Sequence, residues 1–233
     1  MNDAFHTTRW TLVRHATGHS AEGQAALSEL CEAYYAPVVA FLRRSGRDED
    51  AAREAAHAFF ADVLARPSLG GAEPGRGRFR SYLLGALKHH LAHARERDAR
   101  QKRGDGAATI PLAPGTDTSP GVDAADSALP PDREFDRQWA LHILHRAMES
   151  LATEAESPAD FAALRPFIAG EGAHGALAAL AESRGIPAAT LRANVTRLRQ
   201  RFRHHVKAQI APTLDDPANV ETEMVALLAA LAG

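Results

Sequence analysis

The stretch that decides the fold runs from residue 175 to residue 206 and reads GALAALAESRGIPAATLRANVTRLRQRFRHHV. Leu177 and Leu180 recur at helical spacing near its start, which indicates a helix with one apolar face. Gly185 then suits the left-handed position that ends a helix. Pro187 fits the first turn of a following helix, where its missing N–H is not needed. The stretch therefore predicts a helix-turn-helix.

The second helix of this motif combines an apolar stripe with a basic surface. Its apolar residues follow the spacing i, i+4, i+7 and i+11, namely Leu191, Val195, Leu198 and Phe202. Seven Lys or Arg residues lie in 184–207, and no Asp or Glu occurs from 183 to 214. This combination favours DNA binding, and the alternative is an amphipathic core helix whose arginines face solvent. The side chains expected at base edges or nearby phosphates are Thr190, Arg192, Ala193, Asn194, Arg197 and Arg199.

The charge of the chain is distributed unevenly, although the net charge is only −2. Residues 76–103 hold nine Lys or Arg against two acidic residues, and 104–136 hold seven Asp or Glu against one arginine. Two basic blocks therefore flank an acidic connector. The connector also holds five prolines between 104 and 132 and little apolar surface, which predicts a flexible linker.

Helical periodicity covers the rest of the chain, and β-branched residues are sparse. We predict an all-α fold of two small helical domains joined by a flexible acidic linker, the second domain containing the helix-turn-helix. The expected boundaries are a leader at 1–18, a first domain at 19–103, the linker at 104–134, a second domain at 135–211 and a helical extension at 212–233. The extension is expected to fold back on the second domain.

Several classes of protein are disfavoured by the residues present. The single Cys31 excludes an intramolecular disulfide framework and fits a reducing cytoplasm. We expect no membrane-spanning segment and no signal sequence. His89 and His93 have the i, i+4 spacing of metal ligands, but no cysteine or matched carboxylates complete a site, so no metal or cofactor is expected. No phosphate-binding loop or nucleophile motif occurs, and we expect no enzyme.

The order of these features resembles the bacterial RNA polymerase sigma factors of the extracytoplasmic-function (ECF) type, which keep regions 2 and 4. Residues 180–199 are similar to the region 4 pattern of an apolar-Ala pair, Gly-Ile-Pro, Thr-apolar-Arg and a run of arginines. Residues 77–83, GRFRSYL, resemble the start of the region 2 helix that opens the −10 element. Residues 4–13, AFHTTRWTLV, and residues 78–91 are most similar to one subgroup of the family, which has this leader and a C-terminal extension.

The resemblance implies a role in transcription initiation, with core RNA polymerase and promoter DNA as partners. Region 4 would bind the −35 element through the six residues named above. Region 2 would hold −10 phosphates through Arg80, Lys88, His89, Arg95, Arg97 and Arg100. The polymerase-binding positions would be Asp50, Glu54, His57 and Phe60.

One departure from the family concerns this polymerase-binding helix. The family usually carries an Asp-Leu-x-Gln-Glu-x-Phe motif there, whereas His57 and Ala58 replace the Gln and Glu in this chain. Two other interpretations therefore stand beside the sigma factor. One is a diverged DNA-binding regulator that does not support polymerase. The other is a protein-interaction module whose C-terminal helix binds an anti-sigma factor or a kinase-linked regulator.

Overall fold

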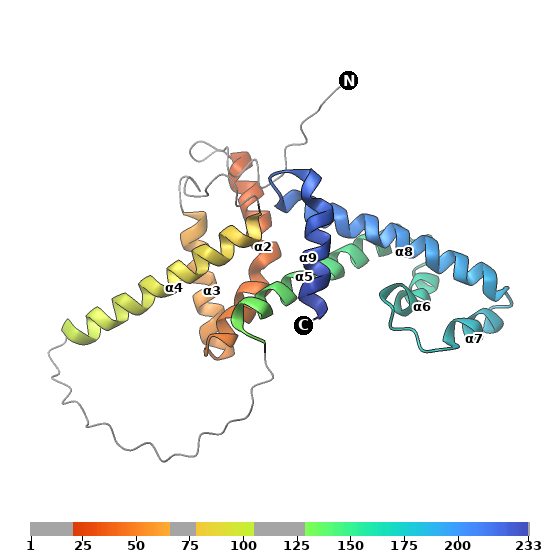
Figure 1. Ribbon diagram of the computed structural model, residues 1–233, viewed down its shortest axis with the longest axis horizontal. Helices are drawn as coiled ribbons and strands as arrows, with labels where there is room; N and C mark the ends of the chain where they lie inside the picture. Colours follow the sequence, from red (N-terminus) through yellow and green to blue (C-terminus); the bar gives the residue numbers. More distant parts are fainter. Residues whose placement is uncertain (1–20, 66–77, 105–128, 233) are drawn as a thin grey trace, which may run out of the picture.

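The computed structural model of the chain describes residues 21–65, 78–104 and 129–232, with side chains described as far as Arg97 in the second range (Figure 1). The predicted leader and most of the predicted linker lie outside these residues. Within them the regular structure is helical, apart from one isolated bridge between Arg78 and Leu214. The all-α prediction is confirmed.

Within residues 21–65 and 78–104 the chain folds into three helices, α2 (Ala21–Arg44), α3 (Glu49–Leu64) and α4 (Phe79–Gly104). Asp48 caps α3, because its side chain accepts a hydrogen bond of 2.8 Å from the Ala51 N–H. Gly46 turns the chain between α2 and α3 with a φ of 93°. A turn residue and a capping residue, both visible in the sequence, therefore separate α2 from α3.

The second half contains α5 (Pro131–Thr153), α6 (Pro158–Ala169), α7 (Ala176–Ser183), α8 (Ala188–Ile210) and α9 (Val220–Ala232). Two 3₁₀ segments, Ala211–Thr213 and Pro217–Asn219, connect α8 to α9. Helix α5 begins inside the predicted linker, because Pro131 is favourable in the first helical turn and Asp132 complements the helix dipole there.

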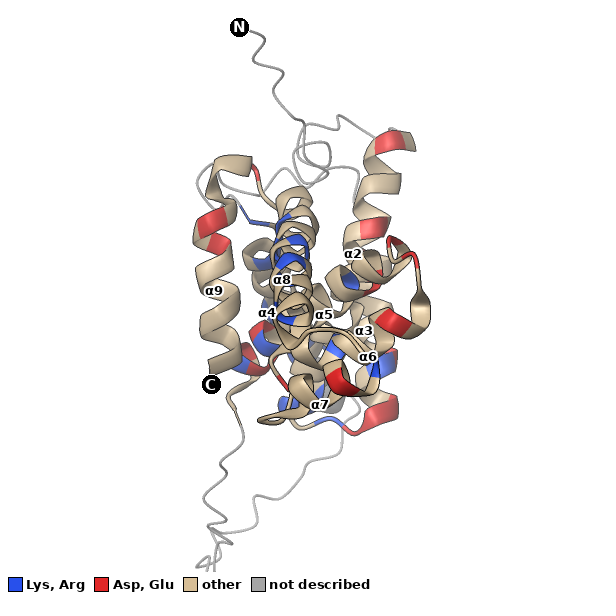
Figure 2. Ribbon diagram, turned by 90° about the vertical axis from the view of Figure 1, so that its right-hand side faces the viewer, with Lys and Arg blue, Asp and Glu red and all other residues tan. Residues whose placement is uncertain are grey.

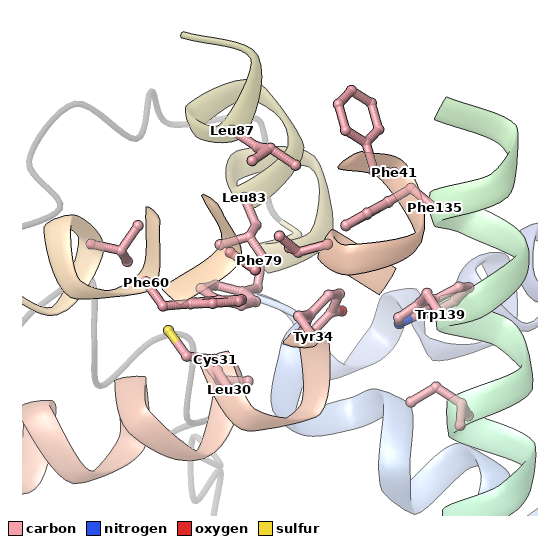
Figure 3. Packing of buried hydrophobic residues seen from close by; sticks show 14 of the residues in the cluster. Leu30, Cys31, Tyr34, Phe41, Phe60, Phe79, Leu83, Leu87, Phe135 and Trp139 are labelled. Atoms are coloured by element: carbon pink, nitrogen blue, oxygen red, sulfur yellow. The ribbon is translucent and has the colours of Figure 1, made fainter. Parts of the chain in front are cut away.

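One hydrophobic core joins the two halves (Figure 3). The ring of Tyr34 in α2 lies edge-on to Phe79 of α4, with centroids 5.1 Å apart, and stacks on Phe135 of α5 at 6.2 Å. Trp139 of α5 is 1% exposed in the same core. Burial of these rings holds α2, α4 and α5 together. The same cluster includes residues of α8 and α9, among them Val206, Ile210 and Leu227.

This shared core corrects the predicted division into two separate domains. The sequence pattern places the apolar stripe of α5 in the second domain, but its Phe135 and Trp139 pack against Tyr34 of the first. Periodicity identifies the apolar face of a helix without saying which partner covers it. Helix α9 packs on α5 and α8 through Leu227, Met224 and Val220, which confirms that the extension folds back.

Two smaller apolar clusters hold the end of the molecule that carries α6 and α7. One contains Met148, Leu151, Phe161 and Ile168, and the other contains Leu164, Ala181, Leu191 and Val195. Leu198 is partly buried against both clusters, so α8 links this end to the rest of the molecule. Figure 1 shows α6 and α7 beside the N-terminal half of the long α8.

The sequence predicts no helix able to span a membrane. Among the described helices, however, α2 is long and apolar enough to do so by length and composition. Half of its apolar window is buried inside the protein, where Leu30, Tyr34 and Leu42 belong to the core. Core helices of soluble proteins pass the same test, so the observed burial of α2 is compatible with a soluble protein.

Candidate nucleic-acid interface

Helices α7 and α8 are joined by a tight turn. Gly185 adopts the left-handed conformation with a φ of 65°, and the Ile186 N–H donates to the Ala181 carbonyl at 3.0 Å. Arg184 forms an ion pair of 2.6 Å with Asp160 of α6. The turn is thus fixed by its backbone and by a contact to the preceding helix, and the first residues of α8 project from it.

The N-terminal half of α8 presents most of the predicted DNA-reading residues. Thr190, Arg192, Ala193, Arg197 and Arg199 are exposed, while Asn194 is half-buried. The opposite face of the helix buries Leu191 and Val195 in the small cluster under the turn. The structure therefore brings the predicted set together on one end of one helix.

Two of these arginines make local hydrogen bonds to neutral groups. Arg197 Nη2 donates to Asn194 Oδ1 at 2.5 Å. The Arg199 guanidinium donates twice to the Phe167 carbonyl, at 3.0 and 2.7 Å. Among the described residues, none of Arg192, Arg197 and Arg199 forms an ion pair with a carboxylate. Three positive charges therefore remain uncompensated at this end of α8.

The C-terminal half of α8 is neutralised by acids from other helices, which the charge pattern along the chain does not predict. Arg201 Nη2 lies 2.5 Å and His205 Nε2 lies 3.2 Å from Glu154 at the end of α5. Hydrogen bonds from Arg201 and His205 lower the pKa of the Glu154 carboxyl. Glu154 lies 47 residues from Arg201 in sequence, so a local charge count does not detect it.

The second compensating acid is Glu221 of α9. It pairs with Lys207 and, at 3.4 Å, with Arg203. The hydrogen bond from Lys207 lowers the pKa of the Glu221 carboxyl. Figure 2 shows the basic residues distributed along α8 and acidic residues on α9. The basic surface available to a ligand is therefore shorter than the sequence indicates.

Arg80 does not occupy the exposed position expected of a phosphate ligand. It is 9% exposed, its Nη1 lies 2.7 Å from Asp136 Oδ1, and its guanidinium carbon lies 4.3 Å from the Trp139 ring centroid. Arg80 Nη2 also pairs at 3.0 Å with Glu223 of α9. The assignment of Arg80 to −10 DNA is corrected, because the acids that bury it come from α5 and α9.

Among the other predicted residues of α4, some side chains contact a neighbouring residue and others are exposed. Lys88 Nζ pairs with Asp132 Oδ2 at 2.5 Å, and His89 Nε2 lies 3.1 Å from His93 Nε2. Arg95 and Arg97 are exposed. The side chain of Arg100 lies outside the described residues. No group of three or more metal-ligating side chains that could hold an ion occurs within the described part of the chain.

The predicted polymerase-binding residues lie on α3. Asp50 and Glu54 are exposed on this helix. His57 is exposed too, but its ring stacks on Tyr35 and its Nε2 lies 2.9 Å from the Tyr35 hydroxyl. Phe60 is 7% exposed and packs in the core beside Phe59, which corrects its assignment as a partner contact. The pair Phe59-Phe60 in the sequence does not reveal that both rings turn inward.

Comparison of the chain with protein-family models, with curated proteins and with solved structures gives no match.

Proposed function

We propose that this protein is a promoter-binding sigma factor of the ECF type, which binds DNA through the N-terminal half of α8. The observation that carries the proposal is the set of three arginines there without a carboxylate partner among the described residues, beside a fixed turn between two helices. A major groove about 12 Å wide admits such a helix. The proposed membership in the sigma factor family rests on the sequence resemblance.

The side chains of this half of α8 suit entry into a groove. Thr190, Ala193 and Arg197 follow the spacing i, i+3 and i+7, so they share one exposed face. Ala193 is small and permits close approach of the helix to the bases. Arg197 offers a bidentate donor for guanine, and Arg192 on the neighbouring face is placed to contact phosphate.

The other half of the molecule supplies the remaining contacts under this proposal. Arg95 and Arg97 on α4 are exposed and bind phosphates of the −10 region. Asp50 and Glu54 on α3 face core RNA polymerase. The protein then acts in the cytoplasm as a non-enzymatic partner, and the polymerase performs the chemistry.

DNA selected from a random pool by the full chain provides the first test. Fluorescence anisotropy is then measured on the selected duplex for the wild type, Arg197→Ala and Arg146→Ala, the last being a control at an exposed arginine of α5. We expect Arg197→Ala to lose about 1–3 kcal/mol of discrimination between selected and scrambled DNA. Arg146→Ala should retain it. Equal discrimination by all three proteins contradicts the assignment of α8.

A diverged regulator that does not support polymerase is the second candidate, and α3 favours it. Phe60 is buried and His57 is engaged by Tyr35, so two of the four predicted polymerase contacts are occupied within the protein. Co-purification of core RNA polymerase with the full chain separates the two candidates. Binding that is weakened by Glu54→Ala supports the sigma factor, and DNA binding without polymerase supports the regulator.

A further inference from the structure

Helix α9 carries two glutamates whose partners lie on the two different helices expected to bind DNA. Glu223 is 1% exposed, and its two carboxylate oxygens pair with Arg78 Nη1 at 2.9 Å and Arg80 Nη2 at 3.0 Å. Arg80 lies in the first turn of α4, and Arg78 immediately precedes the helix. The carboxylate of α9 therefore occupies both arginines at the start of the region 2-like helix.

The second glutamate, two residues earlier, faces α8 instead. Glu221 pairs with Arg203 and Lys207 on the C-terminal half of that helix. Unlike Glu223, it is an exposed side chain, with 62% of its surface accessible. One short helix thus pairs with four cations, two at the start of α4 and two on α8.

The apolar attachment of α9 is one stripe of the helix. Leu227 is fully buried, with Val220, Met224, Ala230 and Leu231 partly buried against the shared core, whereas Val225 and Leu228 on the outer face are 67% and 60% exposed. Ion pairs supplement this apolar contact. The side chains of Arg78, Arg203 and Lys207 are 36%, 64% and 33% exposed, so their pairs with α9 are open to competition from other anions. DNA phosphates are anions held at high local density.

We infer that α9 is an autoinhibitory element that competes with DNA phosphates for Arg78, just before α4, and for Arg203 and Lys207 of α8. The inference rests on the proposed DNA-binding function. When α9 is docked, DNA reaches only the N-terminal half of α8 and the far end of α4. When α9 is displaced, Arg78, Arg203 and Lys207 lose their carboxylate partners and become available to phosphates, whereas Arg80 keeps its ion pair with Asp136. Linkage then requires that DNA binding weakens α9 docking by the same factor by which docking weakens DNA binding.

Two substitutions test this competition in the full chain. Glu221→Gln removes an exposed charge and leaves the core untouched, and Glu223→Gln removes the buried one. Glu149→Gln is the matched control, since Glu149 is an exposed helical acid that pairs with His145 on α5. The probe is a duplex of random sequence, because phosphate competition needs no specific site. Thermal unfolding of each variant establishes that it is folded before binding is measured.

We expect Glu221→Gln and the double variant to bind the duplex more tightly than the wild type, by about fivefold or more for the double variant. The slope of log K against log salt should steepen by about 0.9 for each additional phosphate that the freed cations neutralise. Glu149→Gln should match the wild type. Unchanged affinity and slope in both α9 variants would show that α9 is only a structural support.

Hydrogen exchange on the unmodified protein gives a second readout that does not depend on any variant folding. Adding the duplex should increase exchange of the α9 amides, whereas a structural support would stay protected or become more protected. Unchanged or increased protection of the α9 amides overturns the inference while leaving DNA binding itself intact. Absence of duplex binding by the wild type and by every variant refutes the proposed function and the inference together, so the two failures are distinguishable.

Discussion

Replacing Phe135 with alanine tests whether the two halves of the chain share one core. Phe135 is fully buried and stacks on Tyr34 of α2. Removing a buried phenylalanine ring costs about 3–5 kcal/mol, against a total of about 5–15 kcal/mol for a typical domain. With a denaturant slope of about 2 kcal/mol per M, the urea midpoint should fall by about 2 M.

The location of the effect matters more than its size. Hydrogen exchange should show that Phe135→Ala deprotects α2 as well as α5, because their side chains form one cluster. Leu164→Ala is the control, since Leu164 is also buried but lies in the separate cluster under the turn. It should deprotect α6 and α7 and leave α2 protected. If α2 keeps its full protection in Phe135→Ala, the halves fold independently and the shared core is refuted.

Three further predictions concern individual residues. Burial raises the pKa of the Cys31 thiol to about 12, so the thiol should resist alkylation at pH 8 until the protein unfolds, and rapid labelling of native protein would contradict its burial. Burial and then the nearby Arg146 and His145 lower the pKa of His142 in the folded state. The unfolded chain then binds the proton of His142 more readily than the folded protein does, so the free energy of unfolding should fall as pH drops through about 6.5. Urea midpoints measured across this pH range should fall less steeply in His142→Gln than in the wild type. Gly185→Ala puts a side chain at a φ of 65°, which should lower the free energy of unfolding by about 1–2 kcal/mol and Tm by several degrees. An unchanged Tm would count against that turn geometry.

Most of the secondary structure can be predicted from the sequence because its signals are local. Asp48 caps a helix through an N–H three residues ahead, and Gly185 with Pro187 marks a turn within four residues. The spacing of α8 alone predicts its apolar face, and Leu191 and Val195 are indeed buried. These features depend on neighbours along the chain, which the sequence displays directly.

The pairing of charges could not be predicted, because it depends on which helices meet. Glu223 lies more than 140 residues from Arg80, yet the two share a buried ion pair. Glu154 and Glu221 likewise neutralise arginines of α8 from α5 and α9. A count of charges along the sequence therefore overestimates the free basic surface, and the candidate site contracts to the N-terminal half of α8.

Run-off transcription with core RNA polymerase tests the central claim most directly. The template carries DNA selected by the full chain upstream of a reporter, and the reactions compare wild type, Arg192→Ala and the control Arg146→Ala. The account predicts a product that requires the protein, falls with Arg192→Ala and persists with Arg146→Ala. No protein-dependent product from polymerase that is active with another sigma factor would contradict the sigma factor proposal.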